Sequence, residues 1–163
     1  MILRPIEHRD HAEILRINAA DVDKLAPLSI DRLLLLASMA THSHVVDIDG
    51  NVAGFVITMP PGTAYDSDNY AWFGGRYDDF LYLDRFVVSD RFRRRGVGSF
   101  IYDRAEADAA ARRVLVCEVN IVPANPPSLE FHANRGYLEV GRLEHDDGKK
   151  VTSMLAKDCR ASE

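Results

Sequence analysis

The segment that most constrains this chain is Arg93 to Ser99, in which Gly96 and Gly98 follow three consecutive arginines. An apolar run from Phe80 to Val88 precedes it and is typical of a buried strand, whereas apolar residues at helical spacing follow it through about Ala111. A strand that enters a helix through a glycine-containing turn leaves the first amides of that helix available to an anion. Glycine permits close approach, and arginine adds charge-assisted hydrogen bonds. The segment therefore predicts a phosphate-binding loop.

The spacing of the glycines separates the phosphate ligands that such a loop serves. The dinucleotide-binding fingerprint needs a third glycine, but that position is Ile101. The phosphate loop of nucleoside triphosphatases needs Gly-Lys-Ser/Thr, which this segment lacks. A nucleotide-binding switch is therefore a disfavoured interpretation, and the remaining pattern is Arg93-x-x-Gly96-x-Gly98.

Strand and helix signals alternate along the chain, with no repeat or Ser/Gly-rich linker to divide it. The predicted strands are Met1–Arg4, His44–Ile48, Val52–Met59, Phe80–Val88, Val114–Asn120, Tyr137–Leu143 and Lys150–Ala156. The predicted helices are Asp10–Ala20, a helix capped by Ser29 that runs through Ala40, Val97 to about Ala111, and one from the Asn125 cap to the Gly136 stop. We expect one mixed α/β (α+β) domain spanning residues 1–163, with Thr63–Asp79 as a long loop.

Two motifs resemble the GNAT acetyltransferase superfamily. The Arg93–Gly98 pattern is similar to its acyl-CoA loop, which lies between the fourth strand and the third helix of the family fold. The second family element is an asparagine, a tyrosine seven residues later and then a glycine-aromatic pair. Asn125, His132 and Gly136-Tyr137 resemble it, with His132 in the position of the tyrosine. The resemblance covers nearly the whole chain. It implies a three-layer domain whose central, mostly antiparallel twisted sheet of six to seven strands is flanked by about four helices.

The resemblance also implies where acetyl-CoA, the co-substrate, binds. Backbone groups of one strand end are expected to align the pantetheine arm like an added strand. The amides of the loop are expected to hold the pyrophosphate, and the second motif lies beside the coenzyme. The coenzyme-binding candidates are Phe86, Val87, Val88, Arg93, Arg94, Arg95, Gly96, Val97, Gly98, Ser99, Asn125, Ser128 and His132.

Transfer to an amine requires a base that accepts the ammonium proton and a group that protonates the departing thiolate. Glu118 is the first candidate base because Cys117-Glu118-Val119 resembles the family segment that carries a base, and Asp84 is the second. Both carboxylates could instead form strand ion pairs with Arg85 or Arg112. His132 is the candidate general acid, since imidazole titrates near neutral pH, or else it packs against the coenzyme. As a hypothesis, His132→Phe lowers turnover more than acetyl-CoA affinity.

The long Thr63–Asp79 segment carries most of the candidates for the acceptor site. Its acidic residues suit a cationic amine and its aromatic residues suit an apolar stem. The substrate-binding candidates are Tyr65, Trp72, Tyr77 and Asp78. A contact in a homodimer or a surface lid is the alternative interpretation of the same segment.

Charge and composition limit the partners. A formal charge of −5 argues against a dedicated nucleic-acid binder, and the apolar run from Leu33 to Ala40 is too short to cross a bilayer. Two cysteines, Cys117 and Cys159, are too few for a disulfide scaffold and favour a reducing cytoplasm. The histidine pairs near residues 8 and 42 lack a metal-binding motif, so no metal is expected.

The functional hypothesis is an enzyme that moves an acetyl group from acetyl-CoA directly to a primary amine of a small molecule or protein. Direct transfer is preferred because Cys117 is expected to be buried packing rather than an acylated nucleophile. The alternative is a non-catalytic acyl-CoA-binding module on the same fold, suggested by His132 in place of tyrosine.

Overall fold

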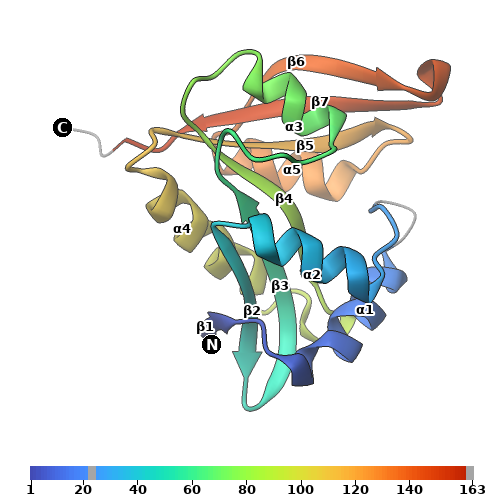
Figure 1. Cartoon of the computed structure of the whole chain (residues 1–163), viewed down its shortest axis with the longest axis vertical. Coiled ribbons are helices and arrows are strands. Elements are labelled where there is room, and N and C mark those ends of the chain that lie inside the picture. The colour runs from blue at the N-terminus through green and yellow to red at the C-terminus, as the bar shows by residue number, and fades with distance from the viewer. Residues whose placement is uncertain (22–24, 161–163) are drawn as a thin grey trace.

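The computed structural model describes residues 1–21 and 25–160 of the 163-residue chain. Seven strands form one sheet in the order β1-β2-β3-β4-β5-β7-β6 (Figure 1). The strands are β1 (Ile2–Pro5), β2 (His42–Ile48), β3 (Asn51–Met59), β4 (Leu81–Val88), β5 (Val114–Val122), β6 (Leu138–His145) and β7 (Lys150–Asp158). All neighbouring strands pair antiparallel except β4 and β5, which are parallel.

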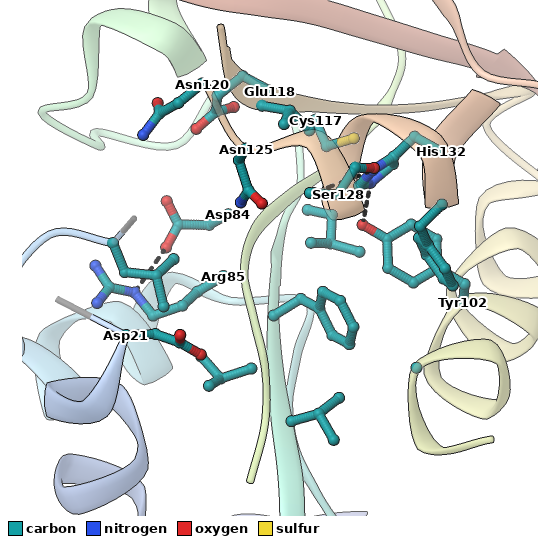
Figure 2. Close-up of a pocket in the computed structure, with 18 of the residues that line it drawn as sticks. Asp21, Asp84, Arg85, Tyr102, Cys117, Glu118, Asn120, Asn125, Ser128 and His132 are labelled. Atoms are coloured by element: carbon teal, nitrogen blue, oxygen red, sulfur yellow. Dashed lines mark hydrogen bonds and ion pairs between the residues drawn. The ribbon is translucent and has the colours of Figure 1, made fainter. Parts of the chain in front are cut away.

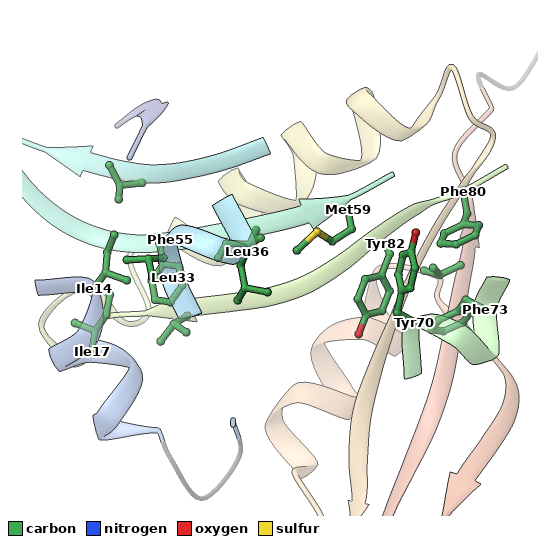
Figure 3. Packing of buried hydrophobic residues seen from close by; sticks show 14 of the residues in the cluster. Ile14, Ile17, Leu33, Leu36, Phe55, Met59, Tyr70, Phe73, Phe80 and Tyr82 are labelled. Carbon is green, nitrogen blue, oxygen red and sulfur yellow. The ribbon is translucent and has the colours of Figure 1, made fainter. Parts of the chain in front are cut away.

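Helices cover both faces of this sheet and make three layers. They are α1 (His11–Ala20), α2 (Ile30–Met39), α3 (Asp68–Gly74), α4 (Val97–Ala109) and α5 (Pro126–Asn134). Side chains of α1, α2 and α3 pack in one core (Figure 3), and side chains of α4 and α5 pack in the other. Consecutive strand residues enter opposite cores, as Val116 and Cys117 of β5 do. The expected three-layer, mostly antiparallel fold is confirmed.

The parallel strands β4 and β5, in the middle of the sheet, pair over only a short stretch and then separate. Its registered partners are Leu81 with Leu115 and Tyr82 with Val116. Within the described residues, the register between these strands stops there, although β4 continues to Val88 and β5 to Val122. The two strands therefore diverge, and the later half of β4 pairs with β3 alone. This divergence is the structural basis of the site described below.

The expected loop from Thr63 to Asp79 is wrong in its middle, where α3 forms. The hydroxyl of Ser67 accepts a hydrogen bond from the Tyr70 amide at 3.2 Å and caps the helix. Tyr70 and Phe73, one turn apart, are both buried. A helix of seven residues ending in Gly74-Gly75 is too short to show a clear periodic pattern, so tertiary burial of its two aromatic rings decides the structure.

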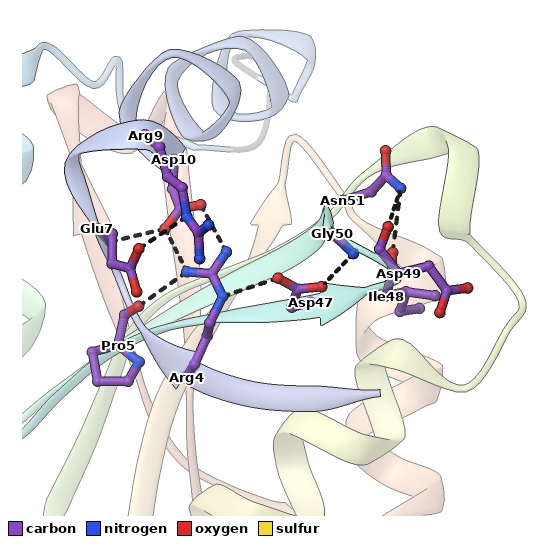
Figure 4. A network of polar contacts seen from close by, with 10 residues as sticks. All are labelled: Arg4, Pro5, Glu7, Arg9, Asp10, Asp47, Ile48, Asp49, Gly50 and Asn51. Carbon is purple, nitrogen blue, oxygen red and sulfur yellow. Dashed lines mark hydrogen bonds and ion pairs between the residues drawn. The ribbon is translucent and has the colours of Figure 1, made fainter.

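Short polar contacts fix the turns at the start of the fold (Figure 4). In the predicted β2–β3 hairpin, Asp49 and Gly50 have φ of 52° and 79°, and Asp47 accepts the Gly50 amide at 2.8 Å. Arg4 of β1 donates to Asp47 at 2.9 Å and to both oxygens of Asp10. These hydrogen bonds lower the pKa of Asp10, and they hold β1 to the start of α1.

The helices give one further observation. Among the described residues, no helix combines the length and the apolar character that crossing a bilayer requires.

Candidate functional site

A cavity of about 780 Å³ lies where β4 and β5 diverge, and it reaches both faces of the sheet. On the face covered by α4 and α5 its lining includes Arg94, Gly98, Tyr102, Asn125, Ser128 and His132. On the face covered by α1 to α3 its lining includes Tyr65, Asn69, Asp84, Glu118, His145 and Lys150. Figure 2 shows Asp84, Glu118 and His132 gathered from three separate elements around this space.

The glycine loop forms the N-terminus of α4 at one end of the cavity. Gly96 adopts φ 78°, a left-handed conformation that strains other residues, and its carbonyl accepts the Phe100 amide in the first helical hydrogen bond. The amides of Val97, Gly98 and Ser99 precede that bond and have no acceptor within the helix. A Cβ on Gly98 would lie 3.2 Å from Phe86 Cζ, so glycine keeps the loop open against β4.

The three arginines of the loop take different positions. Arg93 donates to Asp21 at 3.1 Å and pairs with Asp90 at 2.8 Å. Arg94 lines the cavity, with φ 59°. Arg95 is absent from the cavity lining of the described residues, and its guanidinium lies 5.5 Å from the Phe92 ring centroid. The structure therefore does not bring Arg95 to the cavity.

The remaining coenzyme candidates surround the same end. Phe86, Val87 and Val88 line the cavity on the edge of β4 that diverges from β5. Asn125 occupies the N-cap position of α5 and lines the cavity, but its side chain makes no capping hydrogen bond. The expectation that the Asn125 side chain caps the helix is therefore wrong, and this side chain lies beside the cavity instead (Figure 2).

His132 is buried, and both of its ring nitrogens are engaged. Nδ1 lies 2.7 Å from the Ser128 carbonyl oxygen, which can only accept, so Nδ1 carries the proton. Burial lowers the pKa of His132, which favours the neutral ring. In the neutral ring Nε2 is then an acceptor, and the Tyr102 hydroxyl donates to it at 2.6 Å. This arrangement does not support the expected proton donation by His132, because Nε2 has no proton to give.

Glu118 faces the other side of the sheet, with its side chain half-buried at the cavity wall. Oε1 accepts a hydrogen bond from the Tyr82 hydroxyl at 2.9 Å, while Oε2 is buried with no hydrogen-bond partner among the described residues. Burial, together with the charge of Asp84, raises the pKa of Glu118 to about 8. A carboxyl group with this pKa suits a general base near neutral pH.

Asp84 lies across the divergence from Glu118. Its side chain is 5 % exposed, and Oδ1 accepts a short hydrogen bond of 2.5 Å from the Tyr65 hydroxyl. Oδ2 lies 3.8 Å from Arg85 Nε and, among the described residues, has no hydrogen-bond partner. Burial raises the pKa of Asp84. Arg112, the other expected partner, pairs with Asp79 at 2.7 Å instead.

Comparison with known proteins decides the family. The model of the acetyltransferase (GNAT) family matches residues 8–137, which include the glycine loop, both carboxylates and His132. The chain belongs to the GNAT family. No curated protein sequence matches it.

Solved GNAT structures share the fold at low sequence identity. An N-acetyltransferase from Staphylococcus aureus Mu50 superposes with a TM-score of 0.72 at 18% identity over 98% of each chain. Ard1 from Thermoplasma volcanium superposes with a TM-score of 0.74 at 19% identity over 96% of each chain. The ribosomal-protein-S18-alanine N-acetyltransferase from Escherichia coli gives 0.68 at 16% identity, over 99% of this chain and 96% of its own.

The cavity wall differs in part from the expectation for the Thr63–Asp79 segment. Tyr65 lines the cavity, whereas Trp72, Tyr77 and Asp78 are absent from its lining among the described residues. Trp72 instead packs against Gly141 of β6 and carries the Arg76 guanidinium 3.5 Å from its ring centroid. Trp72 therefore packs α3 against β6 rather than forming a wall of the cavity, whereas Tyr65 is part of that wall.

Sequence reasoning missed several residues that line the cavity. They are Asn69, Tyr82, Tyr102, His145 and Lys150. The one available signal was the even spacing of Tyr82 and Asp84 along a strand, which places both side chains on one face. The others reach the cavity only through the packing of distant segments.

The histidines near residues 8 and 42 are not expected to bind a metal. His42 Nε2 lies 3.3 Å from Asp108, and the His42 and His44 rings are 5.3 Å apart. In residues 1–21 and 25–160, no group of three or more His, Cys, Asp or Glu side chains is arranged to hold a metal ion.

Proposed function

We propose that this GNAT protein transfers an acetyl group from acetyl-CoA directly to a primary amine. One observation carries the proposal: a single cavity joins the glycine loop at the start of α4 to the carboxylates of Asp84 and Glu118. The loop suits the donor and the carboxylates suit a cationic acceptor. The divergence of β4 and β5 lets the two substrates meet through the sheet.

The residues at the α4 end fit the coenzyme. Amides of Val97, Gly98 and Ser99 would hold its pyrophosphate, and Arg94 adds positive charge at the same end. The backbone edge of β4 from Phe86 to Val88 would align its pantetheine arm. When bound, acetyl-CoA supplies an activated acyl group as a thioester.

The residues at the other end prepare the amine. Glu118 accepts the ammonium proton at Oε2, directly or through water, and leaves a neutral nucleophile. As the amine nitrogen bonds to the acetyl carbon, the bond from that carbon to the coenzyme sulfur breaks. The departing thiolate takes the second proton that the nitrogen loses, directly or through water. Tyr82 keeps Oε1 in place by its hydrogen bond. Asp84 holds the ammonium beside Glu118 by charge, and Tyr65 fixes Asp84. Cys117 lies on the opposite face of β5, is 2 % exposed and has a pKa raised by burial, which supports direct transfer without an acylated cysteine.

Two measurements test the proposal. Titration calorimetry compares acetyl-CoA with ATP and NAD, and a thiol-release assay then presents a panel of primary amines. We expect the protein to bind acetyl-CoA but neither ATP nor NAD, and to release thiol only when an amine is present. Glu118→Gln should lower turnover about 10²- to 10⁴-fold. The exposed Glu130→Gln, which lies outside the cavity, is the matched control.

The outcomes separate the candidate functions. Binding of ATP without acetyl-CoA would overturn the proposal. Binding of acetyl-CoA with no amine-dependent thiol release across the panel would favour a non-catalytic acyl-CoA-binding module instead.

A further inference from the structure

The acceptor end of the cavity carries positive as well as negative side chains. Arg32, Arg85 and Lys150 all line it. Arg32 donates to both oxygens of Asp66, at 2.5 and 3.1 Å. Arg85 donates to the Asn18 side chain at 2.7 Å and to the Ala26 carbonyl at 2.8 Å. Arg85 Nε makes no hydrogen bond among the described residues, but it lies 3.8 Å from Asp84 Oδ2. Each of the two guanidinium groups therefore has a carboxylate of the protein beside it.

Lys150 differs from both arginines. It is half-buried at the first position of β7, directly opposite His145 of β6, and both side chains line the cavity. Among the described residues, the Lys150 ammonium makes no hydrogen bond or ion pair. Its positive charge opposes part of the rise in the pKa of Glu118 that burial causes. Because this half-buried ammonium lines the cavity and makes no hydrogen bond to the described part of the protein, it is available to pair with an anion from outside the chain.

The carboxylates of Asp84 and Glu118, in the same cavity, each have an oxygen that lacks a hydrogen-bond donor among the described residues. Asp84 Oδ2 and Glu118 Oε2 are buried and lack hydrogen-bond partners within the described part of the chain. An ammonium group has three donors and could satisfy both oxygens. His145 Nε2 donates a hydrogen bond to Asn69 Oδ1 at 3.1 Å and ties the β6–β7 hairpin to α3. Because Lys150 pairs with His145, this contact also fixes the backbone position of Lys150.

Building on the proposed function, we propose that the acceptor is a small zwitterion. Its primary ammonium lies between Asp84 and Glu118, and its carboxylate pairs with Lys150. Amino acids are the chemical class that carries both groups on one small skeleton. A simple amine fills only the negative half of this site, and a neutral peptide terminus offers no carboxylate to Lys150.

The test is a set of matched acceptors. α-Amino acids and ω-aminocarboxylates of increasing length are compared with amines of the same skeleton that lack the carboxylate, by thiol release and by calorimetry. Because a hydrogen bond to a charged group contributes about 1.5–3 kcal/mol, we expect the carboxylate to improve KM and Kd about tenfold or more. Lys150→Met should remove that advantage, measured as the ratio between the two acceptor classes within each variant, because loss of the Lys150 charge also acts on the pKa of Glu118 and changes the rates with both classes alike.

Lys149→Met is the charge-matched control, because Lys149 is exposed and lies outside the cavity lining. It should retain the carboxylate preference. Thiol release with amines that is indifferent to the carboxylate, or a preference that survives in Lys150→Met, would overturn the inference while the proposed function stands. Calorimetric binding of amino acids that depends on Lys150, without any thiol release, would support the inference and contradict transfer. Absence of binding to either acceptor class would overturn it as well.

Discussion

Glu118 is a carboxylate whose surroundings oppose its negative charge. It shares the cavity with Asp84, and its buried Oε2 has no donor among the described residues. The same surroundings that make the ionised form costly make it a strong proton acceptor once it is formed. At the scale of single residues, the proposed chemistry therefore depends on an elevated pKa.

The pH dependence of kcat/KM follows from that pKa. A base must be deprotonated to act, and the pKa of Glu118 is raised to about 8 by burial. We expect the rate to fall as the pH drops through about 8 and to level off above it, and Glu118→Gln to lose this limb. Initial rates across pH 6 to about 10 check it. A rate that stays constant across pH 8 would contradict the assignment.

His132 and Tyr102 form a second pair of buried side chains, joined by a hydrogen bond of 2.6 Å. His132→Phe leaves the buried Tyr102 hydroxyl without its acceptor and should cost about 1–3 kcal/mol of the free energy of unfolding. Adding Tyr102→Phe should recover part of that loss, because it removes the unsatisfied hydroxyl. Denaturant unfolding of both single variants and the double variant measures the coupling. Additive losses would mean that the two groups are independent.

At the scale of elements, the N-terminus of α4 and the edge of β4 form one unit. Gly98 lies against Phe86 across the loop, and both residues line the cavity. The conformation of the loop and its distance from β4 are set by the two glycines. Side chains there would take space from the proposed coenzyme site.

Gly98→Ala tests this packing. The new methyl would lie 3.2 Å from Phe86 Cζ, so the Phe86 ring or the loop has to move by a few tenths of an ångström, and both line the cavity. We expect the affinity for acetyl-CoA to fall about tenfold, measured by calorimetry. Gly74→Ala is the control, because a Cβ there meets no atom within 4 Å. An unchanged Kd would place the coenzyme away from Gly98.

The contact of α3 with β6 is a second element-scale feature. A Cβ on Gly141 would overlap the Trp72 ring, with Cη2 at 2.7 Å. Gly141→Ala should therefore displace α3, cost about 1–3 kcal/mol of stability and raise KM for the acceptor through Asn69. Thermal unfolding and thiol release check both effects, and the smaller ring in Trp72→Phe should relieve the overlap in the double variant. Unchanged stability of Gly141→Ala would show that the contact is not tight.

The positions of the strands along the chain and the glycine loop could be predicted from the sequence because each is encoded in a contiguous segment, whereas the three-layer arrangement followed from the family resemblance. The Arg93–Ser99 segment carries its own turn chemistry. By contrast, α3 is short and depends on burial of Tyr70 and Phe73 for its stability. Lys150 and Asn69 reach the cavity through pairing and packing with segments far away in the sequence, which no local pattern records.

At the scale of the whole molecule, the sheet separates the proposed donor side of the cavity from the proposed acceptor side. The loop of α4 and His132 lie with one core, while Glu118, Tyr65 and Lys150 lie with the other. The sheet is open where β4 leaves β5. Direct transfer through this opening is the central claim, since it requires neither a covalent intermediate on the protein nor movement of a domain.

Mass spectrometry of the protein and of the small molecules, after mixing with acetyl-CoA with and without an amino-acid acceptor, tests this claim most directly. The account predicts that the protein mass stays unchanged in both mixtures and that the acetyl group appears on the acceptor amine. An acetyl group on Cys117 in the mixture without acceptor, or an acceptor that stays unmodified while acetyl-CoA is bound, would contradict it.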